Sequence, residues 1–286
     1  MAITPALVKE LRERTGVGMM DCKKALVEAD GDIDAAAEIL RKAGQAKADK
    51  KSGRIAAEGR ILVAEGNGRY VILEVNSETD FVANDENFLG FAEKVGQAVL
   101  EHQPADVAAL MALTVDGATL EEARTALVAK IGENIGVRRF EVVESTGNVA
   151  SYVHMNRIGV IVDLEGGDEA LARDIAMQVA ATSPQFVSID DVPKDALDKE
   201  REILVAQAEQ EGKPPEIVQK MVEGRLRKHF DDVTLLGQPF VKNPDQRVRD
   251  LLKGAGASVK GFVRYAVGEG IEKKKENFAE EVAALQ

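Results

Sequence analysis

The residues that could do chemistry are few and lie far apart along the chain. His102, His154, His229 and the single Cys22 have no metal-ligand spacing between any two of them. The sequence holds no GxxxxGK[ST] phosphate loop, no GxSxG elbow and no HExxH helix. An acid–base pair of carboxylates stays open, because 49 acidic residues allow too many combinations. We therefore expect no catalytic residue, no metal and no cofactor, and an enzyme has no positive support.

One segment combines unusual side chains, Asn76-Ser77-Glu78-Thr79-Asp80-Phe81-Val82. It follows an apolar run at 70–75 that predicts a buried strand, and it precedes Asn84-Asp85-Glu86, a helix-start signal. The aromatic ring favours burial, whereas the carboxylate beside it needs water, a donor or a cation. Residue types alone favour Asp80 as a cap of the next helix with Phe81 folded onto the core. The alternative is an exposed pair at a functional loop tip.

Two similar units in the middle of the chain would position this segment. Each has two strand patterns followed by a segment with helical apolar spacing. In the first unit we expect a hairpin turn at Gly66-Asn67-Gly68. We also expect a helix whose inward face carries Phe88, Phe91, Ala92, Val95 and Val99. The expected strands of these units and their neighbours are 60–65, 69–76, 137–143, 149–155, 158–164 and 259–267. Thr119-Leu120-Glu121-Glu122 is a capping box that predicts a further helix. The sequence thus predicts an α+β fold with a pseudo-duplicated core of antiparallel sheets and packed helices.

The beginning of the chain predicts a module of three short helices. Cys22 falls on the apolar face of the second helix, so we expect a small core residue rather than a reactive thiol. Met19 and Met20 lie off that face, where soft side chains suit an adaptable contact surface. The alternative is that one of them fills the gap under the turn. Residues 46–54 have no apolar stripe and predict a linker or a frayed helix.

Two more helices are expected around Gly212-Lys213-Pro214-Pro215, as an antiparallel hairpin inserted into the second core repeat. Its thin apolar seam favours pairing with itself, and a contact in a homodimer is the alternative. An amphipathic C-terminal helix is expected last. The expected domains are 1–54 (three-helix N-terminal module and linker), 55–145 (first core subdomain), 146–190 with 231–268 (second core subdomain), 191–230 (hairpin) and 269–286 (C-terminal helical module).

Composition narrows the classes of partner. A net charge of −12 over 286 residues argues against direct binding to nucleic acid phosphates, which takes a basic face. The single cysteine fits a reducing compartment. The start of the chain has neither the basic nor the apolar region of a signal peptide, and no apolar run approaches roughly 18 residues. We expect a cytoplasmic protein without a membrane segment.

Several motifs resemble those of one protein family. Thr79-Asp80-Phe81-Val82 after a strand end is similar to the signature loop of the elongation factor Ts family. Other matches follow in the family's order along the whole chain. They are LRERTGVGMMDCKKAL at 11–26, KIGENI at 130–135, RIGV at 157–160, GQPFV at 237–241 and VGEGIEK at 267–273. Ser77 departs from the pattern, in which cysteine is common at that position.

The resemblance implies a guanine-nucleotide exchange factor, not an enzyme, which binds the GDP-bound translation GTPase elongation factor Tu and promotes GDP release so that GTP can bind. In the family the loop enters near the Mg²⁺ site of the GTPase and dislodges the metal. Carried over, Thr79, Asp80, Phe81 and Val82 would disturb that site, with Phe81 as the wedge.

The resemblance also implies the other contacts with the GTPase. Arg12, Met19 and Met20 would hold the nucleotide-binding domain, and His154 would contact another domain. The alternative function is a non-catalytic adaptor, because the N-terminal module is similar to ubiquitin-associated three-helix folds that bind peptides or ubiquitin. An adaptor would not need the segment 79–82.

Overall fold

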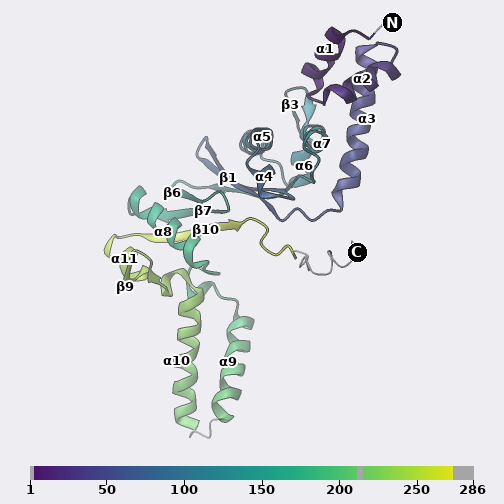
Figure 1. Ribbon diagram of the computed structural model, residues 1–286. Coiled ribbons are helices and arrows are strands. Elements are labelled where there is room, and N and C mark those ends of the chain that lie inside the picture. The colour runs from purple at the N-terminus through teal and green to yellow at the C-terminus, as the bar shows by residue number, and fades with distance from the viewer. Residues whose placement is uncertain (1–2, 211–214, 273–286) are drawn as a thin grey trace. The chain divides into compact units, whose positions relative to one another are not determined.

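The computed structural model describes residues 3–210 and 215–272, which form mixed helices and sheets (Figure 1). The expected α+β class is confirmed. The chain divides into two compact units, residues 1–142 with 265–286 and residues 143–264. The finer division into five domains stays a prediction.

The first unit begins with the expected three-helix module. Its helices are α1 (Pro5–Thr15), α2 (Met19–Glu28) and α3 (Ile33–Ser52). Thr4 caps α1 by accepting the Leu7 N–H, and Gly16 ends it with φ of 67°, a value that glycine adopts without strain. The core of the module consists of buried apolar side chains from all three helices, namely Val8, Leu11, Cys22, Ala25, Leu26 and Ala36. Cys22 is therefore a core residue, as its position on the apolar face predicts.

Helix α3 continues through the segment where the sequence predicts a linker or a frayed helix. Alanine and lysine are strong helix formers, and the far end of α3 packs on α7 (Leu120–Ile131). Ala48 is buried in the core of the first unit. A Cβ at Gly44 would lie 3.4 Å from that of Ala129, so the two helices are in close contact. The linker interpretation was wrong because its small side chains, which make no apolar stripe, pack against a neighbouring helix.

The first unit contains a three-stranded sheet, and residues 79–82 follow the end of its second strand. Its order is β1 (Glu58–Gly66), β2 (Arg69–Ser77) and β5 (Gly136–Glu144), with β1 and β2 paired antiparallel around the expected Asn67-Gly68 turn. The helices and short strands beside it are α4 (Asp80–Ala83), α5 (Glu86–His102), α6 (Val107–Met111), β3 (Thr114–Val115), β4 (Ala118–Thr119) and α7. Helix α5 packs on β1 and β2 with the expected face buried, which carries Phe88, Phe91, Ala92, Val95 and Val99. The predicted capping box of Thr119 and Glu122 is present at α7.

The second unit repeats the plan of a hairpin followed by a helix. Strands β6 (Asn148–His154) and β7 (Ile158–Glu165) pair antiparallel, and α8 (Glu169–Thr182) packs on them. The sheet order is β10-β7-β6, with β10 at Ser258–Ala266. The remaining short elements are η1 (Ile189–Asp191), η2 (Leu235–Gly237), β8 (Pro239–Phe240), β9 (Asn243–Arg247) and α11 (Val248–Gly254).

The expected helical hairpin is formed by α9 (Lys194–Gln210) and α10 (Pro215–Val233), which lie side by side (Figure 1). Their seam has its own apolar cluster, with Leu204, Ala208, Val218, Val222, Leu226 and Phe230 buried. The expected turn at 212–215 lies mostly outside the described residues, as does the expected C-terminal helix after residue 272. No helix in the described part of the chain is long and apolar enough to cross a membrane.

Candidate protein-binding site

Phe81 stands out of the surface on a single helical turn. The segment expected as a loop is short helix α4, and the side chain of Phe81 is 84% exposed. Thr79 caps α4 by accepting the Val82 N–H at 3.4 Å, and Asp85 caps α5. Asp80 is thus not the cap of the next helix, and Phe81 is not folded onto the core. The structure has the exposed pair, the alternative that residue types alone disfavour.

The start of this turn is tied to a distant part of the chain. The carboxylate of Glu133 accepts the Thr79 N–H at 3.0 Å and the Thr79 hydroxyl at 2.6 Å. Ser77 donates its hydroxyl to the Thr79 carbonyl at 2.8 Å, a bond that cysteine could make only weakly. Reasoning from residue types missed Glu133, although it lies in the KIGENI motif.

The end of the turn is held by a guanidinium. Arg60, on β1, donates to the Ala83 carbonyl at 2.8 Å and to the Asn84 side chain at 2.7 Å. Asn84 in turn donates to the Asp80 carbonyl at 2.8 Å. Because both ends are fixed by hydrogen bonds and Ala83 is buried, Phe81 projects from a braced turn rather than a free loop.

The three expected contact residues of the N-terminal module gather at one groove. Met19 and Met20 are 58% and 65% exposed, so neither is a plug under the turn. Together with Arg12 they line a groove of roughly 380 Å³ whose lining is apolar and basic. The other lining residues are Ile3, Pro5, Val8, Lys9 and Lys23. Such a groove suits an apolar helix face flanked by acidic side chains.

His154 belongs to the second unit, where it ends strand β6. Its Nδ1 lies 3.1 Å from the Tyr152 hydroxyl, and the two rings stack with centroids 6.1 Å apart. Met155, expected at the end of the strand, lies in the turn with φ of 49° and is 77% exposed. Asn156 also has positive φ, and the Arg157 N–H donates to the His154 carbonyl at 2.9 Å, which closes a tight turn. His154 is therefore exposed beside a hairpin tip.

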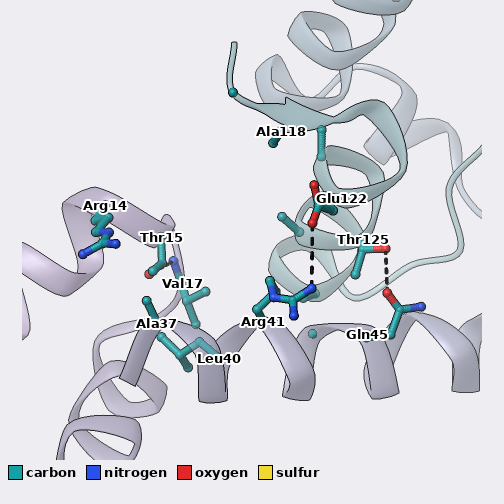
Figure 2. Close-up of a pocket in the computed structure, with 15 residues that line it drawn as sticks. Arg14, Thr15, Val17, Ala37, Leu40, Arg41, Gln45, Ala118, Glu122 and Thr125 are labelled. Atoms are coloured by element: carbon teal, nitrogen blue, oxygen red, sulfur yellow. Dashed lines mark hydrogen bonds and ion pairs between the residues drawn. The ribbon is translucent and has the colours of Figure 1, made fainter. Parts of the chain in front are cut away.

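A second groove of about 370 Å³ lies between the N-terminal module and α7 (Figure 2). Its charged side chains already have partners. Arg14 pairs with Asp34 at 2.6 Å, and Arg41 lies 3.8 Å from Glu122. Because these charges pair within the protein, we assign the groove no ligand.

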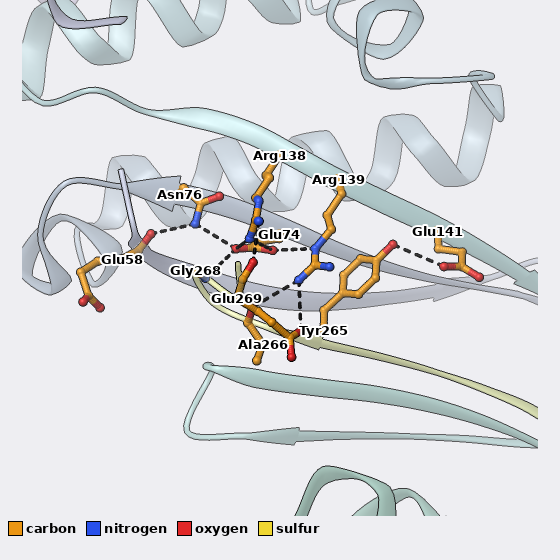
Figure 3. Close-up of polar contacts among 10 residues, drawn as sticks. All are labelled: Glu58, Glu74, Asn76, Arg138, Arg139, Glu141, Tyr265, Ala266, Gly268 and Glu269. Atoms are coloured by element: carbon orange, nitrogen blue, oxygen red, sulfur yellow. Dashed lines mark hydrogen bonds and ion pairs between the residues drawn. The ribbon is translucent and has the colours of Figure 1, made fainter. Parts of the chain in front are cut away.

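The buried carboxylate of Glu74, in the first unit, accepts several hydrogen bonds from other residues of the protein (Figure 3). Glu74 accepts hydrogen bonds from Arg138 at 3.0 Å, Arg139 at 2.7 Å, Asn76 at 3.0 Å and the Gly268 N–H at 2.8 Å. Burial alone would raise the pKa of Glu74, but these donors outweigh it and hold the pKa below its ordinary value. A carboxylate saturated in this way anchors the segment after β10 and is not poised as a general base.

The described residues offer little that could act as a catalytic centre. Among them, no three His, Cys, Asp or Glu side chains are placed to hold a metal ion. The pKa of Tyr265 is raised to about 12 by burial and by nearby Glu141, and the Arg139 guanidinium lies 4.0 Å from its ring centre. The described surface does present Met19, Met20 and Phe81 as exposed apolar side chains on helices α2 and α4. That arrangement is typical of a protein that acts by contact with another protein.

Comparison with known proteins assigns the family. Residues 78–269 match the family model described as elongation factor TS. The chain is 60% identical to elongation factor Ts of Thioalkalivibrio sulfidiphilus and 62% identical to that of Alkalilimnicola ehrlichii. Each comparison covers 99% of this chain and 98% of the relative. Elongation factor Ts of Halorhodospira halophila is 58% identical over the same shares. The chain belongs to the elongation factor Ts family of translation elongation factors.

Proposed function

We propose that this protein is a guanine-nucleotide exchange factor that binds elongation factor Tu in its GDP-bound form, disturbs its Mg²⁺ and phosphate site, and promotes GDP release. The observation that carries the proposal is Phe81, an aromatic side chain left 84% exposed on a braced turn in a chain of this family. No covalent bond is made or broken in such an exchange, so the protein needs no catalytic residue.

The energetics require a difference between two states of the GTPase. A GTPase holds its nucleotide through phosphate-cradling backbone groups and Mg²⁺. A partner speeds release if it binds the nucleotide-free form more tightly, and linkage makes nucleotide weaken the partner by the same factor. Burying a phenylalanine side chain stabilises a contact by roughly 1.5–3 kcal/mol. If only the open GTPase accepts the Phe81 ring, that difference corresponds to about a ten- to hundredfold shift.

The other candidate residues would bind the GTPase without disturbing its Mg²⁺ and phosphate site. We propose that the groove at Arg12, Met19 and Met20 holds the nucleotide-binding domain of the GTPase, and that His154 contacts another domain. The three basic side chains that line the groove, Lys9, Arg12 and Lys23, support this, because the chain as a whole is acidic.

The location of the protein in the cell and its class of partner are part of the same proposal. Translation elongation places it in the cytoplasm. The net charge of −12 supports a protein partner over direct contact with nucleic acid. A homodimer through α9 and α10 stays a prediction.

The test is stopped-flow release of fluorescent GDP from elongation factor Tu in excess Mg²⁺. We expect strong acceleration by the parent protein and a loss of at least about tenfold with Phe81→Ala. Ile189→Ala is the matched control, since Ile189 is also an exposed apolar side chain but has no assigned role. The Ile189→Ala variant should accelerate GDP release from elongation factor Tu as much as the parent protein does.

Binding of each variant to the nucleotide-free GTPase is measured alongside. A Phe81→Ala protein that still binds but no longer accelerates release would support the wedge. No acceleration by the parent would reject the exchange function and favour an adaptor that uses the N-terminal module.

A further inference from the structure

The carboxylates of Glu78 and Glu133 make hydrogen bonds that link residues 78–79, at the start of α4, with residues 133–134. Glu133 accepts two hydrogen bonds from Thr79, and Glu78 accepts the Asn134 N–H at 2.7 Å. Each of two adjacent residues in one segment thus bonds to one of two adjacent residues in the other, 54 and 56 positions away. We propose that this crossed pair, here called the carboxylate clasp, positions Phe81 for nucleotide exchange. The inference rests on the proposed function.

Glu133 does more than add a bond to a helix that is already capped. The Thr79 hydroxyl donates a hydrogen bond to Glu133, which leaves a lone pair of the hydroxyl oxygen to accept the Val82 N–H. The carboxylate therefore orients the hydroxyl that caps α4. Hydrogen bonds to an ionised acceptor are about twice as strong as neutral ones, and Glu133 is only partly exposed, so water competes weakly. A four-residue helix has little stability of its own and depends on such a bond.

The other half of the clasp reaches the N-terminal module. Glu78 pairs with Arg54 at 3.2 Å, just beyond the end of α3. The Asn134 side chain donates to the Ser52 carbonyl at 3.3 Å and to the Arg54 carbonyl at 2.8 Å. Two adjacent residues thus hold both segments. Glu133 binds the start of α4, and Asn134 binds the C-terminal end of α3. The clasp therefore links the backbone at the start of α4, which carries Phe81, to the end of α3.

Glu133 acts through Phe81, so it is a positioning residue and its effect should depend on the ring. Glu133→Ala removes both hydrogen bonds from Thr79, and we expect it to lower the rate of GDP release from the GTPase by at least roughly tenfold. In a Phe81→Ala background the same change should cost less than about twofold. Glu133→Gln keeps one acceptor oxygen and should fall between the parent and Glu133→Ala.

The experiment is a double-mutant cycle of Glu133→Ala and Phe81→Ala in the stopped-flow GDP-release assay. The matched control is Asp191→Ala, because Asp191 accepts the N–H and the hydroxyl of Ser188 at 2.8 Å each, as Glu133 does with Thr79. Asp191→Ala should leave the release rate unchanged. Amide hydrogen exchange at Val82 is followed in the free protein, where Glu133→Ala should speed exchange while the circular dichroism spectrum stays that of the parent.

The outcomes separate the two proposals. Acceleration by the parent together with a rate loss for Glu133→Ala that vanishes in the Phe81→Ala background would support the clasp. Acceleration by the parent with an unchanged rate for Glu133→Ala, or with an equal loss in both backgrounds, would overturn the clasp and leave the exchange function standing. No acceleration by the parent would overturn the exchange function, and the positioning role with it.

Discussion

At the scale of single residues, the neighbouring Asp80 and Phe81 show how fixed backbone decides exposure. By residue type the ring belongs in the core and the acid at a helix cap. In the structure Thr79 is already the cap, and Arg60 and Glu133 hold the two ends of the turn. The ring is left outside because the backbone that carries it cannot turn inward without breaking these bonds.

The buried carboxylate of Glu74 gives a prediction at the same scale. Glu74→Gln removes the buried anion that Arg138 and Arg139 share and leaves Arg139 with the Glu269 carboxylate at 3.7 Å. We expect the free energy of unfolding to fall by about 2–4 kcal/mol at neutral pH. Because folding lowers the pKa of Glu74, its contribution is present above the ordinary glutamate pKa of about 4.3 and is lost as the pH falls through the lower, folded-state value. The difference between parent and variant should therefore shrink at acid pH.

Urea unfolding followed by circular dichroism at several pH values measures this difference. Glu38→Gln is the control, since Glu38 also has a pKa lowered by hydrogen bonding to an arginine, Arg41, but lies on the surface. It should change stability far less. A gap between parent and Glu74→Gln that widened at low pH would contradict the assignment.

At the scale of elements, the contact of α3 with α7 replaces the expected linker. A run of alanine, glycine and lysine carries no apolar stripe, so its pattern gives no sign of burial. Gly44 and Ala48 are buried nevertheless, because small side chains let two helices approach closely. The contact with α7 adds to the helix propensity of alanine and lysine and makes this part of α3 a stable helix.

Gly44→Leu tests that contact. A side chain at this position would push α3 from α7, and we expect overpacking to cost about 1–3 kcal/mol. Gly90→Leu is the control, because Gly90 also lies within a helix but a Cβ there would meet nothing within 4 Å. Gly90→Leu should be neutral or stabilise by up to about 1 kcal/mol. Equal unfolding midpoints for the two variants would show that the helices are not in close contact.

At the scale of the whole molecule, the proposed function assigns binding and disturbance of the GTPase to different parts of the chain. The groove with Met19 and Met20 lies in the N-terminal module, whereas Phe81 lies beside the first sheet. An exchange factor of this design would use the module for affinity and the wedge for release. Removing the module should raise the concentration of this protein that is needed to accelerate GDP release.

Two truncations test this separation. A chain that starts at residue 33 keeps α3, whereas one that starts at residue 55 loses the helix whose Ala48 fills the core beside α7. We expect both to need higher concentrations to accelerate GDP release, and only the shorter chain to unfold at clearly lower urea. Unchanged exchange by the chain from residue 33 would remove α1 and α2 from the mechanism.

Much of the fold could be predicted from local pattern. The Asn67-Gly68 turn, the capping box at Thr119 and the buried face of α5 lie where the sequence predicts them, because each depends on residues close together along the chain. Residue types already singled out the segment 76–82 and the pair Met19 and Met20. The roles of residues 79–82, Arg12, Met19, Met20 and His154 came from motif resemblance and remain proposals. Glu133 and Arg60 were missed, since a bond over 20 or more positions leaves no periodic signal.

The sequence by itself determined the α+β class, the two hairpin-then-helix units and the motifs of the elongation factor Ts family. Those features follow from short-range preferences of the backbone and from runs of residue types. Only the tertiary structure decided that Phe81 is exposed, that α3 continues to Ser52, and that the carboxylates of Glu78 and Glu133 cross at the base of the turn. The physical reason is that each of these depends on the burial or the hydrogen-bond partner supplied by a segment far away in the chain.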